Sequence, residues 1–135
     1  MKDVKVTYVY CDVNSKKARY VLLKDYNSKD IFRVTNYRGR FLKNYKDEKV
    51  LVLDRFYGDM PITILNDLLD VYPVDLGFGY NLPKYEEVYI FSPVCLSLLY
   101  MEESRVKQCA LARRIHNYIE ATGNVCVSFG RPHFI

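Results

Sequence analysis

The chain has 135 residues and a mass of 15.9 kDa, the size of one domain with a single ordinary core. Hydrophobic residues make up 50% of the sequence and charged residues 27%, which excludes an intrinsically disordered protein. The formal net charge of +4 permits contact with nucleic acid or an acidic surface, and it argues against a protein that imitates the charge of DNA.

Several classes of protein are excluded by what the sequence lacks. No apolar run approaches the roughly 18 residues that span a bilayer, and the first residues lead into a strand-like pattern with no signal-peptide core. We therefore expect a cytoplasmic protein without membrane contact. The four cysteines form no CxxC motif and are interpreted as reduced, mostly buried thiols. HExxH and GxSxG are absent, which removes most metal-hydrolase and serine-hydrolase interpretations.

The first predicted elements alternate between strand and helix. Residues 4–10 are rich in β-branched and aromatic side chains at alternate positions and predict a strand. After a polar loop, residues 17–25 predict a short helix, and residues 30–34 predict a second strand. Residues 36–48 form a charged, tyrosine-rich connection with little periodicity.

The middle of the chain begins with a continuous apolar run over residues 50–53, which ends at Asp54. Such a run is typical of a strand covered on both faces, as in a parallel sheet. Pro61 is expected as the first residue of a helix. That helix has the spacing of a buried stripe at Ile64, Leu65, Leu68 and Leu69.

The last third predicts another buried strand over residues 88–91, then a long helix over residues 102–121. This helix would place Leu111, Ile115, Tyr118 and Ile119 on one side. Residues 125–129 predict a last strand. The alternation predicts a single α/β domain over residues 1–135, with a mostly parallel sheet and flanking helices.

Three segments, taken in order, resemble a known family: VLVLDRF at residues 50–56, residues 61–76, and VYIFSP at residues 88–93. They are similar to the helicase-type ATPase domain of replication initiator (Rep) proteins, a branch of the superfamily-three helicases. These initiators serve rolling-circle plasmids, integrative elements and small circular DNA viruses. Residues 17–21, 32–37 and 111–116 extend the resemblance over most of the chain. The resemblance implies a small P-loop NTPase-like domain.

The resemblance places the family's phosphate-binding loop, GxxxxGK[ST], at residues 11–18. Glycines in such a loop let backbone N–H groups approach the phosphates, the lysine neutralises phosphate oxygens, and the hydroxyl binds magnesium. Lys17 keeps the lysine position. Cys11 and Lys16 stand where the motif has glycine, and Ala18 has no hydroxyl. The loop is therefore degenerate, and the alternative for Lys17 is a solvated lysine at the start of a helix.

The other positions implied by the resemblance are also altered. Asp54 keeps the first acid, a magnesium ligand in the family, but Arg55 replaces the second, which polarises the attacking water. Residues 92–93, Ser-Pro, replace the polar sensor. Arg113 and Arg114 retain the pattern of an arginine finger. Each lost electrostatic group typically costs a factor of about 100–1000 in rate, so we expect no ATPase activity, no cofactor and no metal. The alternative for Asp54 is an ion pair with Arg55 or Lys17.

A candidate binding surface lies in the tyrosine-rich connection. Its aromatic and cationic residues are interleaved: Tyr37, Arg38, Arg40, Phe41, Lys43, Tyr45 and Lys46. Such a pattern is typical of surfaces that stack on bases or bind proteins. The alternative is a packed loop whose tyrosines cover the edge of the sheet.

The resemblance and the degenerate motifs together predict a Rep-derived pseudo-ATPase that works by binding, in the cytoplasm of a bacterial host. Its partner would be a host or mobile-element protein, and the most concrete form is an anti-CRISPR-type inhibitor encoded by a phage or mobile element. One alternative is a nucleic-acid-binding replication accessory protein, with weak contact to nucleic acid. Another is a residual ATPase with non-standard ligands.

Overall fold

The structure, a computed structural model, describes residues 4–11, 15–70, 74–75, 80–81, 84–122 and 125–132. Its elements follow one another in this order: β1 (Lys5–Cys11), α1 (Ser15–Leu23), the 3₁₀ turn η1 (Ser28–Asp30), β2 (Ile31–Val34), β3 (Val50–Leu53), α2 (Ile62–Leu69), β4 (Val74–Asp75), β5 (Tyr80–Asn81), β6 (Glu87–Ser92), α3 (Arg105–Arg114), β7 (Asn117–Thr122) and β8 (Val125–Ser128).

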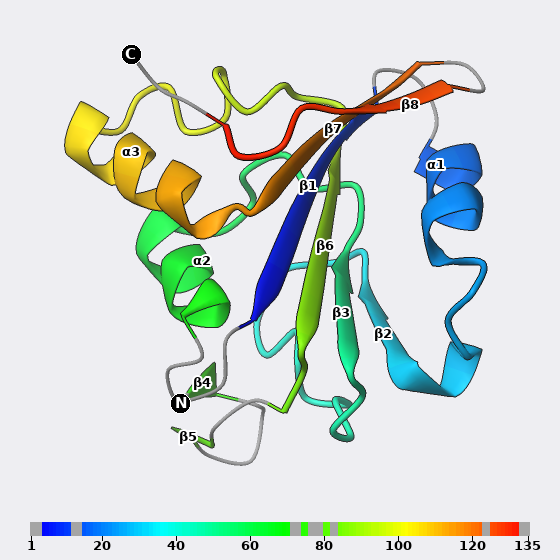
Figure 1. The fold of residues 1–135 in the computed structure, drawn as a ribbon. Helices are drawn as coiled ribbons and strands as arrows, with labels where there is room; N and C mark the ends of the chain where they lie inside the picture. The colour runs from blue at the N-terminus through cyan, green and yellow to red at the C-terminus, as the bar shows by residue number, and fades with distance from the viewer. Residues whose placement is uncertain are drawn as a thin grey trace.

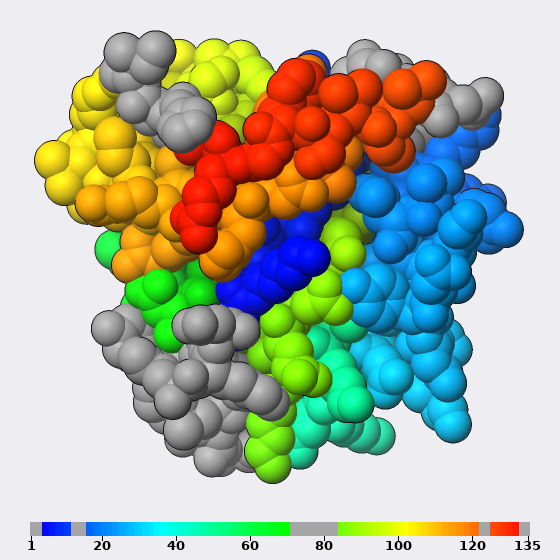
Figure 2. All heavy atoms as spheres, in the orientation of Figure 1, coloured from blue at the N-terminus to red at the C-terminus, as the bar shows by residue number. Residues whose placement is uncertain are grey.

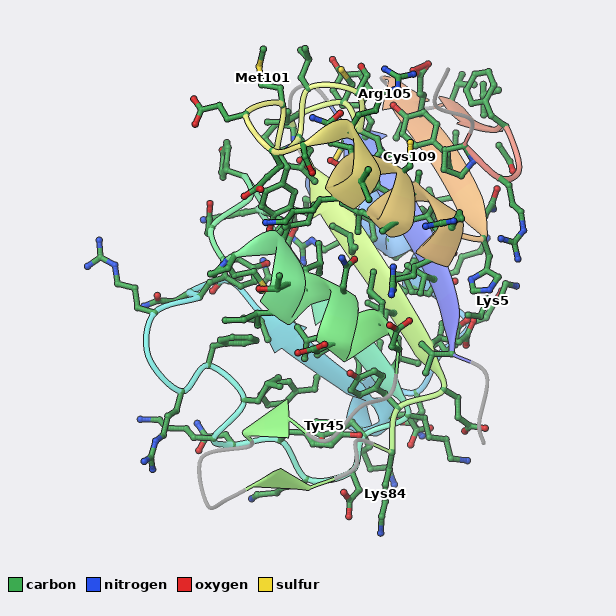
Figure 3. The ribbon with its side chains drawn as sticks, turned by 90° about the vertical axis from the view of Figure 1, so that its left-hand side faces the viewer. Lys5, Tyr45, Lys84, Met101, Arg105 and Cys109 are labelled. Carbon is green, nitrogen blue, oxygen red and sulfur yellow. The ribbon has the colours of Figure 1, made fainter. Side chains whose placement is uncertain are left out.

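A six-stranded sheet with the order β2-β3-β6-β1-β7-β8 forms the centre of the fold. Neighbouring strands from β2 to β7 are parallel, and β8 pairs with β7 in the antiparallel direction. Helix α1 covers one face of the sheet, and α2 and α3 cover the other (Figure 1). Figure 3 shows α2 and α3 over the strands, with Arg105 and Cys109 on α3. The predicted α/β class with a mostly parallel sheet is confirmed.

Two hydrophobic clusters lie on the two faces of the sheet. Strand β3 contributes to both, because Leu51 and Leu53 belong to the cluster under α2 and α3, whereas Val50 and Val52 belong to the cluster under α1. All four side chains are buried, as the continuous apolar run predicts. This double coverage holds the carboxyl end of β3, and therefore Asp54, inside the protein.

The long helix predicted over residues 102–121 is wrong in its second half. Helix α3 ends at Arg114, and residues 117–122 form β7, which pairs along β1. Tyr118 packs against the cluster under α2 and α3, while Ile119 belongs to the cluster on the opposite face. The apolar spacing of this segment fits both a helix and a strand that alternates between two covered faces, and pairing with β1 decides between them.

His116 marks the change from helix to strand. Its backbone N–H donates to the carbonyl oxygen of Val6 at 2.9 Å, and its Nδ1 accepts from the backbone N–H of Val6 at 3.0 Å. These two bonds attach the end of α3 to the beginning of β1, so the next residues continue as a parallel neighbour of that strand.

Smaller expectations are also corrected. Pro61 caps α2 from outside, so the helix begins at Ile62, and Ile64 is 43% exposed rather than part of the buried stripe. All four cysteines are thiols outside any disulfide, but only Cys11 is buried. No described helix has the length and apolar character needed to cross a membrane.

Candidate functional site at the carboxyl edge of the sheet

The topology gathers the ends of three strands at one edge of the sheet. Strand β1 leads through α1 towards β2, whereas β6 leads through α3 to β7 on the other side of β1. The connections therefore diverge between β1 and β6, and ligands of open α/β sheets bind at such a point, outside the carboxyl ends of the strands. Cys11, Asp54 and Ser92 end or directly follow the three adjacent strands β1, β3 and β6.

Asp54 is the centre of this edge, and its side chain is fully buried at 0% exposure. Arg33, from β2, donates to Oδ2 of Asp54 through Nε at 2.9 Å and through Nη2 at 2.6 Å. Arg19, from α1, places its Nε 3.0 Å from the same oxygen. That Nε is buried and makes no hydrogen bond, so its contact with Asp54 is an ion pair without hydrogen-bond geometry.

The remaining polar atoms of Asp54 are also hydrogen-bonded. Its Oδ1 accepts from the backbone N–H of Arg55 at 2.9 Å. Its backbone N–H donates to the carbonyl oxygen of Val34 at 2.9 Å, and its carbonyl oxygen accepts from the hydroxyl of Tyr37 at 2.6 Å. Every backbone and side-chain polar atom of the residue thus has a partner within the protein.

The charge balance of this cluster is positive. Burial lowers the pKa of the Arg19 guanidinium; the Asp54 carboxylate opposes this shift, and the charges of Arg33 and Arg55 add to it. One buried carboxylate thus faces the guanidinium groups of Arg19 and Arg33, with Arg55 next in the chain. Arg55 has a left-handed backbone, with φ of 51°, and an exposed side chain. Such a conformation is uncommon outside glycine and turns the chain sharply after β3.

This arrangement does not fit a magnesium ion on Asp54. Magnesium needs carboxylate oxygens that face open space and accept little else. Here Oδ2 contacts two arginines and Oδ1 accepts a backbone N–H. Asp54 was expected to form an ion pair with Arg55 or Lys17. In the structure its ion pairs are with Arg19 and Arg33 instead. Arg55 contributes only its backbone to Asp54 among these contacts.

The position predicted for the polar sensor is turned inwards as well. Ser92 is buried, and its hydroxyl accepts from the backbone N–H of Val94 at 3.0 Å. The thiol of Cys11 lies 3.8 Å from the carbonyl oxygen of Ser92. Residues 12–14 of the predicted phosphate loop lie outside the described residues. Lys17 lies in α1, two residues before Arg19, and its side chain is exposed.

Arg113 and Arg114 do not belong to this edge. They are the last residues of α3, next to the beginning of β7, which lies near the start of β1 and therefore at the opposite edge of the sheet. Arg114 forms two parallel bonds of 2.7 Å with the carboxylate of Asp70, at the end of α2. It ties α2 to α3, while Arg113 is exposed.

The candidate surface over residues 37–46 divides into an inner and an outer part. Tyr37 and Tyr45 are 8% and 4% exposed, and their hydroxyls donate to the backbone oxygens of Asp54 and Glu48. Burial raises the pKa of Tyr37, and the nearby charges of Asp54 and Asp59 raise it further. Stacking of these two rings on bases is therefore excluded by their burial. Phe41 is half-buried, and the exposed cations are Arg38, Arg40, Lys43 and Lys46.

The sequence analysis did not anticipate one pocket, which lies at the other edge of the sheet. It has a volume of about 320 Å³ and is lined by Tyr26, Asp30, Lys49, Val50, Glu86 and Glu87. The hydroxyl of Tyr26 donates to Oε2 of Glu87 at 2.7 Å. The lining residues come from four separate segments without a common motif, so no sequence pattern could have found them.

A scan against known protein families gives no match to the chain, and no curated protein matches it either. The similarity to Rep ATPase domains thus stays a prediction from the sequence. Over the described parts of the chain, no three His, Cys, Asp or Glu side chains are grouped so that they could hold a metal ion.

Proposed function

We propose that this protein is a pseudo-ATPase of Rep-like descent that acts by contact alone, as a binding or inhibitor module directed at a host or mobile-element protein. The most concrete form is an anti-CRISPR-type inhibitor. One observation supports the loss of catalysis above the others: the carboxylate of Asp54 is buried and paired with both Arg19 and Arg33.

The chemical argument concerns charge as well as space. An ATPase keeps a carboxylate available at this place so that magnesium can neutralise the phosphates. Here the guanidinium groups of Arg19 and Arg33 have taken the place of a cation. Releasing Asp54 for a metal would leave the partly exposed guanidinium groups of Arg19 and Arg33 without their counter-ion, which is unfavourable. Breaking these contacts would therefore destabilise the fold, and this cost opposes metal binding at Asp54.

The partner is expected to present acidic groups. The four cations of the outer part of the loop, Arg38, Arg40, Lys43 and Lys46, are all exposed. Charged rims of this kind steer an oppositely charged partner and set specificity. The aromatic residues between them are turned towards the core, so contact would be made mainly through charge.

Isothermal titration with ATP and Mg²⁺, followed by a hydrolysis assay, tests the loss of catalysis. We expect no binding heat and no phosphate release, and the same result for the Lys17→Ala variant as a matched control. Magnesium-dependent release of phosphate by the wild-type chain, abolished by Lys17→Ala, would contradict the proposal.

The inhibitor function is tested by plating phage on a panel of bacterial strains with active CRISPR–Cas systems. Expression of the wild-type chain should restore plaques in at least one strain. A variant with serine in place of the four loop cations should restore fewer plaques at equal protein level. If no strain responds, and affinity capture from bacterial lysate recovers neither a defence nor a replication protein, the inhibitor function is rejected.

The second candidate, a nucleic-acid-binding replication accessory, is favoured by the same four exposed cations. It predicts binding to single-stranded DNA with an affinity that falls steeply as salt rises. A gel-shift titration at low salt separates the two functions, because the contact-only inhibitor should show no such binding.

A further inference from the structure

Strand β8 forms one edge of the sheet, and no described segment pairs with its outer side. Figure 1 shows β8 at the rim of the sheet, and in Figure 2 residues 125–132 run across the surface of the molecule. Three apolar side chains of this segment are exposed, Val125 at 58%, Val127 at 44% and Phe129 at 58%. Natural edge strands usually carry lysine or proline against unwanted pairing, but residues 125–129 contain neither.

The hydrogen bonds between β7 and β8 determine which backbone groups point outwards. The N–H of Phe129 donates to the carbonyl oxygen of Tyr118, and the N–H of Tyr118 donates to the carbonyl oxygen of Gly130. Because inward and outward residues alternate along an antiparallel strand, Val125 and Val127 also bond towards β7. The N–H and C=O groups of Cys126 and Ser128 therefore face the open edge.

The side chains alternate in the same way. Cys126 packs against the hydrophobic cluster under α1, so Val125 and Val127 lie on the face that carries α2 and α3. Phe129 is on that face too, with its ring 6.2 Å from that of Tyr118. The exposed apolar groups thus form one row beside an unpaired edge.

We infer that β8 is a self-association edge, and that its partner is β8 of a second copy of this chain, paired antiparallel about a two-fold axis at Val127. In this register Cys126 lies opposite Ser128 of the second copy and Ser128 opposite its Cys126. All the outward backbone groups of both residues are then hydrogen-bonded, and the two sheets become one continuous sheet.

The side chains complement one another in the same register. Val127 faces Val127 of the second copy, and Val125 faces Phe129 of the second copy. Every exposed apolar side chain of the row therefore gains an apolar neighbour. Pairs of aromatic and β-branched residues are favourable across antiparallel strands. No like charges meet, because residues 125–129 carry none. Pairing about a two-fold axis also closes the assembly at two copies, which a heterologous pairing of β8 with β2 would not do.

The mass of the full-length chain in solution, measured by sedimentation at increasing concentration, tests this inference. We expect the wild-type chain to move from 15.9 kDa towards twice that mass. Val127→Lys should remain monomeric over the same range, because two lysines would face each other across the axis. Val106→Lys is the matched control: Val106 lies on α3 and is 76% exposed, and its replacement should leave the dimer intact.

The register is tested by cross-linking, which also serves if Val127→Lys does not fold. Residues facing each other in a non-hydrogen-bonded antiparallel pair have Cα atoms about 4.5 Å apart, within the range of a disulfide. Val127→Cys should form a covalent dimer on mild oxidation, well above the level of the wild-type chain. Val125→Cys should not, because residue 125 faces residue 129 of the other copy.

A chain that stays at 15.9 kDa at every concentration would overturn the inference. So would a dimer that Val106→Lys disrupts as strongly as Val127→Lys, or equal cross-linking of the variants at 125 and 127. The inference concerns the assembly of the chain and stands independently of the proposed inhibitor function.

Discussion

Two arginine–carboxylate clusters lie at opposite edges of the sheet. At the carboxyl edge, Asp54 is 0% exposed between Arg19 and Arg33. At the other edge, Arg114 and Asp70 form a bidentate pair whose side chains are 28% and 25% exposed. The resemblance to Rep ATPase domains predicts that Asp54 and Arg114 belong to one nucleotide site, yet in the structure each forms an ion pair within the fold. The two clusters differ most in the burial of the carboxylate, 0% for Asp54 and 25% for Asp70, and we expect this difference to determine how much each contributes to stability.

Breaking the ion pairs of the buried Asp54 should have the largest effect. Asp54→Asn would leave Arg19 and Arg33, whose side chains are 22% and 40% exposed, without the buried carboxylate as their counter-ion. Because solvent reaches both guanidinium groups, we expect the free energy of unfolding to fall by about 2–3 kcal/mol, measured by urea denaturation. Asp59→Asn, at an exposed position in the same loop, should change it by no more than about 0.5 kcal/mol. Equal effects of the two variants would show that burial is not the cause.

Breaking the more exposed pair, Arg114 and Asp70, should cost less stability. Arg114→Met removes two charge-assisted hydrogen bonds to Asp70, and solvent screens part of what they contribute, so we expect a loss of about 1–2 kcal/mol. Arg114→Lys should restore only part of it, because an ammonium group cannot bind a carboxylate in the bidentate manner. Arg113→Met, on the neighbouring exposed residue, is the control and should be nearly neutral. If Arg114→Met lost as much stability as Asp54→Asn, the two clusters would not differ in their contribution to stability.

A smaller effect, with a pH signature, is expected from Tyr37→Phe. The variant loses the bond to the carbonyl oxygen of Asp54, at a cost of about 1 kcal/mol at neutral pH. Because burial raises the pKa of Tyr37 above its usual value of about 10, the folded state favours the neutral phenol. This stabilisation is complete below pH 10 and is lost as the pH rises through the folded-state pKa.

The pH signature is measured as the difference in unfolding free energy between the wild type and Tyr37→Phe, at pH 8 and at about pH 11. The wild type should lose more stability between the two values than the variant does. Tyr20→Phe, at a side chain that is 72% exposed, should leave the slope of the wild type unchanged. Parallel curves for wild type and Tyr37→Phe would contradict the assignment.

The smallest effects on stability are expected at the outer part of the loop. Replacing Arg38, Arg40, Lys43 or Lys46 singly by serine should alter the free energy of unfolding by no more than about 0.5 kcal/mol. Thermal unfolding checks this. A loss above 1 kcal/mol at any of the four would assign that cation to the fold rather than to a contact surface.

Much of the fold could be predicted because local patterns and tertiary packing agree. The run of four apolar residues in β3 and the alternation in β1 both correspond to strands in the structure. The segment over residues 117–122 was wrongly predicted to be helical, since its apolar spacing suits a helix and a strand equally. The segment forms the strand β7 because it pairs along the side of β1 that faces away from β6, and the hydrogen bonds of His116 to Val6 place it there.

The candidate site was predicted in part. The burial of a carboxylate at the end of β3 follows from the strand that precedes it. Its partners do not follow, because Arg19 and Arg33 belong to a helix and a strand that pattern analysis treats as ordinary. Tyr37 and Tyr45 were predicted to lie on a binding surface because cationic residues surround them in the sequence. In the structure both are buried, and their hydroxyls donate to backbone carbonyl oxygens.

By itself, the sequence determined most of the alternation of strands and helices and the parallel character of the sheet, because these depend on residue types at short spacing. The tertiary structure alone decided which charges meet, which tyrosines are buried and which strands lie at the edges of the sheet formed by the described residues. Those outcomes depend on contacts between segments far apart in the chain, whose free energies come from desolvation and from strand order, and no local pattern of residues records either.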